Sequence, residues 1–280
     1  MLDAFTMLTE DLDHPEACAW DPLSGCIYAG GEDGQIYSVS LDGDVAVVAD
    51  TGGGILGVAV DGNGLVYACD EGRREVVRVD PRSGQVDVVS SGAADRPMIE
   101  PNYLCFAADG TLYVTDSSDW DARNGAIYRV AGGDTTVWTT ALPRYPNGCC
   151  LSSDGAWLYV VESSRPGVSR VPIGARGEAG APDTVVDLAQ NTVPDGIAFD
   201  AAGGLYIACY RPDLIYRLSP DGPLDVVAAD PLGMTLNTPT NVAFAGPDLD
   251  RLVVANVGEW HLLIGDVGAR GAPLHYPILS

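Results

Sequence analysis

The sequence contains no lysine and only three histidines among its 280 residues. Its fifteen arginines are outnumbered by 39 aspartates and glutamates, which gives a formal net charge of −24 at pH 7. A surface of that sign repels polyanions, so nucleic acids and anionic membrane surfaces are excluded as partners. Cations and small neutral molecules are the ligands that this charge favours.

Long apolar runs and paired cysteine motifs are also missing. No run approaches the roughly 20 apolar residues that a membrane helix needs, and the first residues, MLDAFTMLTEDLD, are acidic where a secretory signal is basic and then apolar. We therefore expect a cytoplasmic protein. Seven cysteines without CxxC spacing indicate neither a disulfide framework nor a zinc cluster. The adjacent Cys149 and Cys150 are either a redox-active pair or two ordinary strand residues.

The sequence lacks the periodicity of amphipathic helices and contains a repeat instead. No stretch keeps an apolar period of 3.6 residues for more than two turns. One phrase occurs six times instead: a turn, an apolar strand, a turn rich in Asp and Gly, and a strand of the LYV type, as in VPDGIAFDAAGGLYIACY. The second residues of the six copies are Glu16, Leu56, Asn102, Asn147, Asp195 and Thr240, so the copies lie 40, 46, 45, 48 and 45 residues apart.

The repeat predicts a six-bladed β-propeller, an all-β fold that occupies residues 1–280 as a single domain. Two further strand patterns separate successive copies, for example GAIYRVAG followed by TTVWTT, which gives four strands per blade. A β-sandwich with coincidental similarity between its parts is the alternative. We expect Ala4–Thr9 to close the ring as a strand of the last blade, since AFTMLTED precedes the first copy.

Four of the repeated positions carry oxygen ligands. The first strand of each propeller blade lines the central channel, so Glu16, Asn102, Asn147 and Asp195 are predicted to converge on one mouth of it. Two carboxylates and two amides suit one hard divalent cation: Ca²⁺ is favoured by its flexible geometry, Mg²⁺ or Mn²⁺ also fit, and Zn²⁺ is less natural without His or Cys. The alternative is that Asn and Asp recur because they stabilise turns.

The loops after the second strands should open on the same face as the metal. They read DSSDWDARNG, ESSRPG, CYRPD and NVGEW. Aromatic and basic side chains in these loops are candidates for the walls of a substrate pocket, although each aromatic residue could equally pack between blades. The candidates are Trp120, Arg165, Tyr210, Arg211 and Trp260.

The motifs PEACAWD, PNYLCFAADGTLYVTD, YPNGCCLSSDGAWLYV, VPDGIAFDAAGGLYIA and PTNVAFAGPDLDRLVV stand in this order along the chain. Together they make the sequence resemble the gluconolactonase, regucalcin (senescence marker protein) and luciferin-regenerating enzyme family. The resemblance implies a divalent metal held by Glu16, Asn102, Asn147 and Asp195, and hydrolysis of lactones with Asp195 also serving as general base. Metal polarisation of a carbonyl and deprotonation of water by a carboxylate agree with that chemistry.

The sequence departs from the family pattern at two positions beside the first Asn ligand. Members that act on sugar lactones carry Arg two places before it and Asp directly after it, where this chain has Glu100 and Tyr103. Both are candidate substrate-binding residues. A carboxylate and an aromatic ring there lead us to expect a neutral, partly apolar lactone instead of a sugar-acid lactone.

Two classes of function remain open. One is a metal-dependent lactonase, or a related enzyme that uses the same metal for cyclisation or isomerisation. The other is a calcium-binding or interaction propeller without turnover, since propellers host many non-enzymes. An Asp next to a metal, at an open mouth, favours catalysis. The sequence does not determine the oligomeric state.

Overall fold

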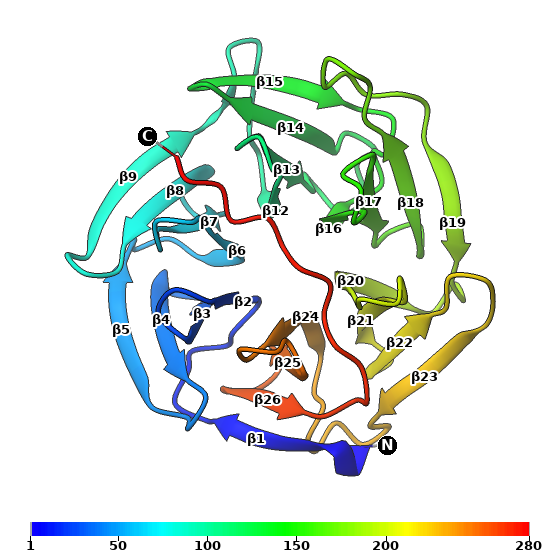
Figure 1. Ribbon diagram of the computed structural model, residues 1–280. Helices are drawn as coiled ribbons and strands as arrows, with labels where there is room; N and C mark the ends of the chain where they lie inside the picture. The colour runs from blue at the N-terminus through cyan, green and yellow to red at the C-terminus, as the bar shows by residue number, and fades with distance from the viewer. Residues whose placement is uncertain (1, 280) are drawn as a thin grey trace.

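The computed structural model describes residues 2–279 and shows six four-stranded antiparallel sheets arranged in a ring (Figure 1). The all-β, six-bladed propeller predicted from the repeat is therefore confirmed. Blade one contains β2 (Cys18–Asp21), β3 (Cys26–Gly30), β4 (Gln35–Ser40) and β5 (Val45–Asp50). Blade two contains β6 (Ile55–Val60), β7 (Val66–Asp70), β8 (Glu75–Asp80) and β9 (Gln85–Ser90).

The next three blades follow in chain order. Blade three contains β12 (Pro101–Phe106), β13 (Leu112–Asp116), β14 (Ala126–Ala131) and β15 (Asp134–Thr139). Blade four contains β16 (Pro146–Leu151), β17 (Trp157–Glu162), β18 (Gly167–Pro172) and β19 (Asp183–Asp187). Blade five contains β20 (Val193–Phe199), β21 (Leu205–Arg211), β22 (Leu214–Leu218) and β23 (Leu224–Ala229). A small hairpin of β10 (Gly92–Ala93) and β11 (Arg96–Pro97) precedes blade three.

The sixth blade joins the two ends of the chain. It contains β24 (Pro239–Ala245), β25 (Arg251–Asn256), β26 (His261–Gly265) and, as its outermost strand, β1 (Phe5–Thr9). β1 follows a short 3₁₀ turn, η1 (Leu2–Ala4), and Phe5 pairs with Gly265 in an antiparallel register. The predicted closure by the N-terminal strand is confirmed.

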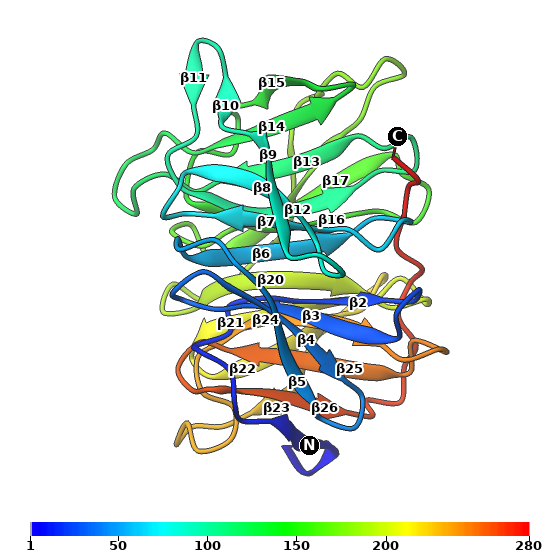
Figure 2. The same cartoon turned by 90° about the vertical axis from the view of Figure 1, so that its left-hand side faces the viewer.

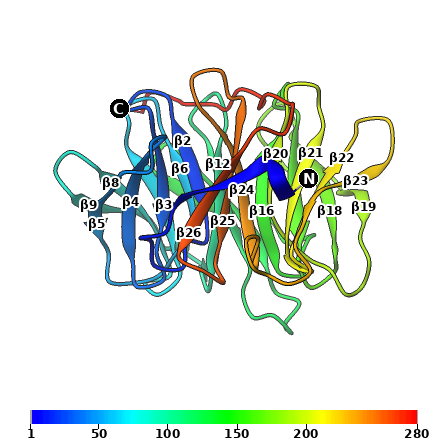
Figure 3. The same cartoon turned by 90° about the horizontal axis from the view of Figure 1, so that it is seen from below.

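The C-terminal segment does not take part in this closure. It crosses one face of the ring from blade five towards blade two, and Figures 1 and 3 show it lying over the central axis. Ala272 N donates to Phe199 O at 2.9 Å, and Gly62 N donates to Pro277 O at 2.8 Å. Because these partners lie at the ends of the inner strands or in the turns that follow them, the tail covers the face opposite the strand beginnings. It also closes an axial cavity of about 110 Å³.

The core lies between neighbouring blades, whose twisted sheets pack face to face (Figure 2). Second strands such as β7 and β13 are buried at every residue.

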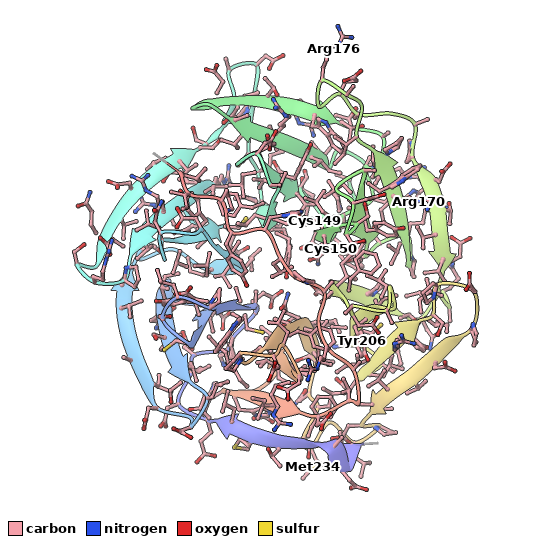
Figure 4. The ribbon with its side chains drawn as sticks, in the orientation of Figure 1. Cys149, Cys150, Arg170, Arg176, Tyr206 and Met234 are labelled. Atoms are coloured by element: carbon pink, nitrogen blue, oxygen red, sulfur yellow. The ribbon has the colours of Figure 1, made fainter. Side chains whose placement is uncertain are left out.

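All seven cysteines are free thiols, and Cys149 and Cys150 lie near the axis while Arg176 lies at the outer rim (Figure 4). Cys149 and Cys150 pack in different core clusters on opposite sides of β16, as ordinary strand residues do. No helix among residues 2–279 is long and apolar enough to cross a membrane.

Candidate functional site

The three inner strands that contain a candidate ligand, β12, β16 and β20, each show a shift of pairing register at that residue. The register of β12 against β13 shifts between Pro101 and Tyr103, at Asn102. β16 shifts between Pro146 and Cys149, and β20 between Pro194 and Ile197. A bulge breaks the alternation of a strand and re-aims the bulged side chain, and bulges are frequent beside active sites. The recurring polar residue therefore turns toward the axis because the strand starts with a bulge.

These three bulged residues and Glu16, which precedes β2, meet in one pocket of about 480 Å³ at the mouth of the channel. Its lining includes all four predicted ligands, Glu16, Asn102, Asn147 and Asp195. The two amides and Asp195 are buried, and Glu16 is partly buried. Four blades thus supply two carboxylates and two amides to one space, as the repeat predicted.

Hydroxyl groups from neighbouring strands fix the backbone on both sides of the ligands. Ser163 Oγ donates to Pro194 O at 2.7 Å, directly before Asp195, and Thr115 Oγ1 donates to Asn147 O at 2.8 Å. Thr240 Oγ1 donates to Glu16 O at 2.6 Å. All three bonds connect adjacent blades, so the relative position of the ligands depends on contacts between blades.

Glycine allows the ligand-bearing strands to approach each other. A Cβ atom on Gly148 would lie 2.4 Å from Asp195 O, and one on Gly57 would lie 2.5 Å from Asn102 O. These distances are far below van der Waals contact, and the atoms met are backbone atoms that cannot rotate away. The Asn-Gly pair at 147–148 is therefore required by packing next to the site and is not only a turn signal.

The pocket is strongly acidic. Burial, with repulsion from Glu71 and Glu100, raises the pKa of Glu16 to about 8. Burial and then the charge of Glu16 raise the pKa of Asp195 well above its usual range, although a hydrogen bond with Asn147 opposes the shift. Burial also raises the pKa of Glu100 to about 7. Burial and neighbouring negative charges both raise the pKa of a carboxyl group that lacks a compensating positive charge.

The donor set fits a hard divalent cation. Asn147 Oδ1 is buried and has no hydrogen-bond partner among residues 2–279, and an unpaired buried acceptor is rare in folded proteins. Neither Glu16 nor Asp195 forms an ion pair with an arginine in the described part of the chain. Oxygen atoms from carboxylates and amides are the ligands that Ca²⁺ and Mg²⁺ take in proteins. A cation held by these four residues would offset the repulsion between the two carboxylates.

Four of the seven candidate substrate residues line this pocket, namely Glu100, Trp120, Tyr210 and Arg211. Tyr103 does not. Its side chain extends down the channel into the axial cavity, where its hydroxyl accepts a hydrogen bond of 2.7 Å from Asn241 Nδ2. Because of the bulge at Asn102, the side chains of Asn102 and Tyr103 point into different cavities although the two residues are adjacent in the sequence.

Arg165 and Trp260 also lie outside the pocket lining. Arg165 forms ion pairs with Glu162 at 3.4 Å and Asp187 at 3.5 Å, which direct it to the outer part of blade four. Trp260 Nε1 donates to His14 Nε2 at 2.8 Å, and this bond holds the indole over the junction of blades six and one. Local acidic or imidazole partners therefore determine where both side chains point.

The pocket contains residues that the sequence analysis missed: Leu56, Glu71, Tyr145, Ser163 and Val193. Leu56 is the second residue of the second repeat, so its position in the repeat could have identified it. Tyr145 lies two residues before Asn147, as Glu100 lies two residues before Asn102, and this correspondence was also available in the sequence.

A second group of polar residues, Asp13, His14 and Glu32, has its ligand atoms within 4.8 Å of one another. Both nitrogens of His14 are engaged, Nδ1 with Val257 O at 2.8 Å and Nε2 with Trp260. An imidazole that is hydrogen-bonded on both sides has no free lone pair for a metal. The 480 Å³ pocket that contains Glu16, Asn102, Asn147 and Asp195, called the axial pocket below, is therefore the better candidate for a cation site.

Comparison with solved structures places this geometry among known propellers. A gluconolactonase from Xanthomonas campestris superposes with a TM-score of 0.81 at 22% identity, covering 94% of this chain and 89% of the other. A calcium-binding protein described as regucalcin, from Agrobacterium tumefaciens, superposes with a TM-score of 0.79 at 22% identity over 98% and 96% of the two chains. At this level of identity the likeness establishes the fold.

Sequence comparison extends the likeness to the family. A 6-deoxy-6-sulfogluconolactonase from Pseudomonas putida is 33% identical over 50% of this chain and 47% of its own length. A gluconolactonase from Zymomonas mobilis is 28% identical over 62% of this chain and 54% of its own length. The chain thus matches about half the length of these two relatives. The family model of the SMP-30/Gluconolactonase/LRE-like region matches residues 10–257. With that match over most of its length, the chain belongs to the SMP-30/gluconolactonase/LRE-like family.

Proposed function

We propose that this protein is a metal-dependent hydrolase that opens a lactone ring at the axial pocket. The observation that carries the proposal is the convergence of Glu16, Asn102, Asn147 and Asp195 from four blades on one cavity. The names of the relatives, gluconolactonase and 6-deoxy-6-sulfogluconolactonase, support the reaction class. Membership of the family adds the same expectation.

The four ligand residues would hold one divalent cation, with Ca²⁺ favoured and Mg²⁺, Mn²⁺ or Zn²⁺ as alternatives. When bound, such an ion supplies a Lewis acid for the carbonyl oxygen of the substrate. We assign to Asp195 the roles of orienting a water molecule and accepting its proton, since it lines the pocket and forms no ion pair with an arginine among residues 2–279. In this proposal the residues of the pocket align the ester bond of the lactone, and Asp195 receives the proton that the attacking water loses.

The lining of the pocket supports a substrate that is neutral and partly apolar. Four carboxylates, from Glu16, Glu71, Glu100 and Asp195, stand against the single guanidinium of Arg211. An excess of negative charge disfavours an anionic substrate even after a divalent cation offsets two of the charges. Apolar surface comes from residues of four blades: Leu56, Trp120, Tyr145, Val193 and Tyr210.

The proposal is tested by removing and restoring the metal. Protein treated with a chelator should hydrolyse γ- and δ-lactones at background rate in a pH-stat, and it should recover when Ca²⁺, Mg²⁺, Mn²⁺ or Zn²⁺ is added. It should also melt at a lower temperature, because only the folded state assembles the site. Full activity in metal-free protein, or no bound metal with unchanged melting, would contradict the proposal.

A single substitution separates binding from proton transfer in the same assay. Asp195→Asn keeps an oxygen ligand but removes the basic group, so we expect turnover to fall by about 10²-fold or more, with the fold retained. Isothermal titration calorimetry with the metal checks that the ligand set still binds. Near-normal turnover in the variant would show that Asp195 is not the base.

A further inference from the structure

Tyr145 stands in an unusual backbone conformation at the edge of the pocket. Its φ angle is 59°, in the left-handed region that bulky residues rarely adopt. Such a conformation persists only where the surrounding structure imposes it, and it is concentrated at functional sites. The ring lines the pocket, two residues before the ligand Asn147.

Hydrogen bonds on the chain around Tyr145 impose this conformation. Ser163 N donates to Tyr145 O at 3.1 Å, and Ser164 N donates to Arg144 O at 3.3 Å. Arg144 N donates to Glu162 Oε1 at 3.1 Å. The segment is thus tied on both sides of Tyr145 to the end of β17, and the direction of its side chain follows from the backbone.

Two contacts with blade three hold the ring itself. The Tyr145 hydroxyl donates a hydrogen bond to Glu100 Oε1. Trp120 packs against the ring, with 4.9 Å between centroids and 60° between planes. We call Trp120 and Tyr145 the aromatic wall. It spans the boundary between blades three and four.

The aromatic wall offers apolar surface that the protein does not cover. Trp120 remains 46% exposed although it packs on Tyr145. The carboxylate of Glu100 is occupied as a hydrogen-bond acceptor for Tyr145, so it serves as a tether for the ring. An aromatic face beside a polar reaction centre binds planar and alkyl groups better than a ring covered with hydroxyl groups.

We propose that the aromatic wall determines the substrate specificity of the lactone hydrolysis, by selecting lactones with an aryl or alkyl substituent over polyhydroxylated lactones. Tyr145 and Trp120 contact the substituent, and Glu100 is a positioning residue that acts through Tyr145. The inference rests on the proposed function and adds the residues that select the substrate. It assigns the preference to ring contact and not to charge.

The central variant is Tyr145→Gly, because glycine adopts a positive φ freely and removes the ring without straining the backbone. Arg74→Gly is the matched control: Arg74 has a φ of 60°, is exposed, and does not line the pocket. The value of kcat/KM is measured for a phenyl-substituted γ-lactone and for gluconolactone, and metal affinity is measured by calorimetry. Tyr145→Gly should reduce kcat/KM for the phenyl lactone about tenfold, with less than about twofold change for gluconolactone and unchanged metal affinity. Arg74→Gly should leave all three values unchanged.

Substitutions of Glu100 separate the tether from the charge. Glu100→Gln removes the charge but keeps an acceptor for the Tyr145 hydroxyl, so the preference should stay within about twofold of the parent. Glu100→Ala removes the acceptor and should lower the preference about threefold or more. If Gln and Ala shift the preference equally, charge and not ring position sets it, and the proposed role of Glu100 is overturned.

The outcomes for Tyr145 also distinguish this inference from the proposed function. Equal losses for both lactones in Tyr145→Gly, or a loss of metal affinity, would show that the residue only supports the site, and the inference would fail while hydrolysis stood. If the parent hydrolyses neither lactone, the proposed function fails. Calorimetric binding of the phenyl lactone then decides the inference: about tenfold weaker binding to Tyr145→Gly supports it, and equal binding refutes it.

Discussion

At the scale of single residues, one buried carboxylate organises the loop that leads into the sixth blade. Asp230 is 5% exposed and accepts hydrogen bonds from the backbone N–H groups of Leu232, Met234, Thr235 and Leu236, at 2.7 to 3.2 Å. Burial alone would raise the pKa of Asp230, but these bonds outweigh it and hold the pKa below its usual value of 3.8. The charged form is therefore the one that the fold stabilises.

Asp230→Asn should lower the free energy of unfolding by about 1–3 kcal/mol at neutral pH, since the amide cannot accept all four bonds. A folded-state pKa below the unfolded value means that the stabilisation is complete above 3.8 and is lost as the pH falls below it. Urea unfolding should thus show a constant difference from the parent between pH 7 and about 5, which shrinks below pH 3.8. Asp248→Asn, at an exposed ion pair with Arg270, is the control and should change stability by about 0.5 kcal/mol or less. A difference for Asp230→Asn that persisted unchanged to pH 3 would contradict this account.

At the scale of elements, the repeat was sufficient to predict that the candidate ligands meet in one pocket, but not which neighbours line that pocket with them. The second residue of each copy reaches the axis in Asn102, Asn147 and Asp195, as the spacing implied. The family pattern predicts Tyr103 as a substrate-binding residue, but the bulge at Asn102 directs its side chain down the channel. A bulge depends on the pairing of two strands, so a single strand's sequence does not reveal it.

Tyr145 was missed for a related reason. Its conformation comes from hydrogen bonds to the end of β17 and from a tether to Glu100 of another blade. None of these partners is close to it in sequence, and a tyrosine before a proline reads as an ordinary extended residue. The repeat offset that Tyr145 shares with Glu100 pointed to its position in the sequence, but the direction of its ring depends on partners distant in the sequence, which the sequence did not reveal.

The approach of β16 and β20 gives a test of how strands position the ligands. In Gly148→Ala the new methyl group would lie 2.4 Å from Asp195 O and 2.7 Å from Gly196 Cα, so the two strands must separate and move Asn147 relative to Asp195. We expect at least about tenfold weaker metal binding by calorimetry and a lower melting temperature, because overpacking against backbone costs about 1–3 kcal/mol. Gly222→Ala is the control, since a Cβ there has no neighbour within 4 Å and its φ is not positive. Unchanged metal affinity in Gly148→Ala would show that the strands adjust without moving the ligands.

At the scale of the whole molecule, the ring is closed by hydrogen bonds between the two ends of the chain. β1 is the outer strand of blade six and pairs with β26, while the C-terminal tail lies across the ring face opposite the pocket. β1 and the C-terminal tail therefore contribute differently to the stability of the ring. β1 completes a sheet, whereas the tail covers an already complete ring and is joined to it by few hydrogen bonds, among them those from Gly62 N to Pro277 O and from Ala272 N to Phe199 O.

Deleting residues 1–9 should therefore be far more damaging than ending the chain after Gly271. The first deletion leaves the backbone of β26 unpaired at an exposed edge, which invites edge-to-edge association and removes the contacts of buried Phe5 with its core cluster. We expect aggregation or a fall in melting temperature of more than about 5 °C, measured by light scattering and calorimetry, whereas the C-terminal truncation should stay monomeric with a smaller decrease. Because the pocket opens on the face opposite the tail, the C-terminally truncated protein should also retain its metal affinity. A protein without residues 1–9 that remains monomeric and melts with the parent would show that the ring does not depend on β1 for its closure.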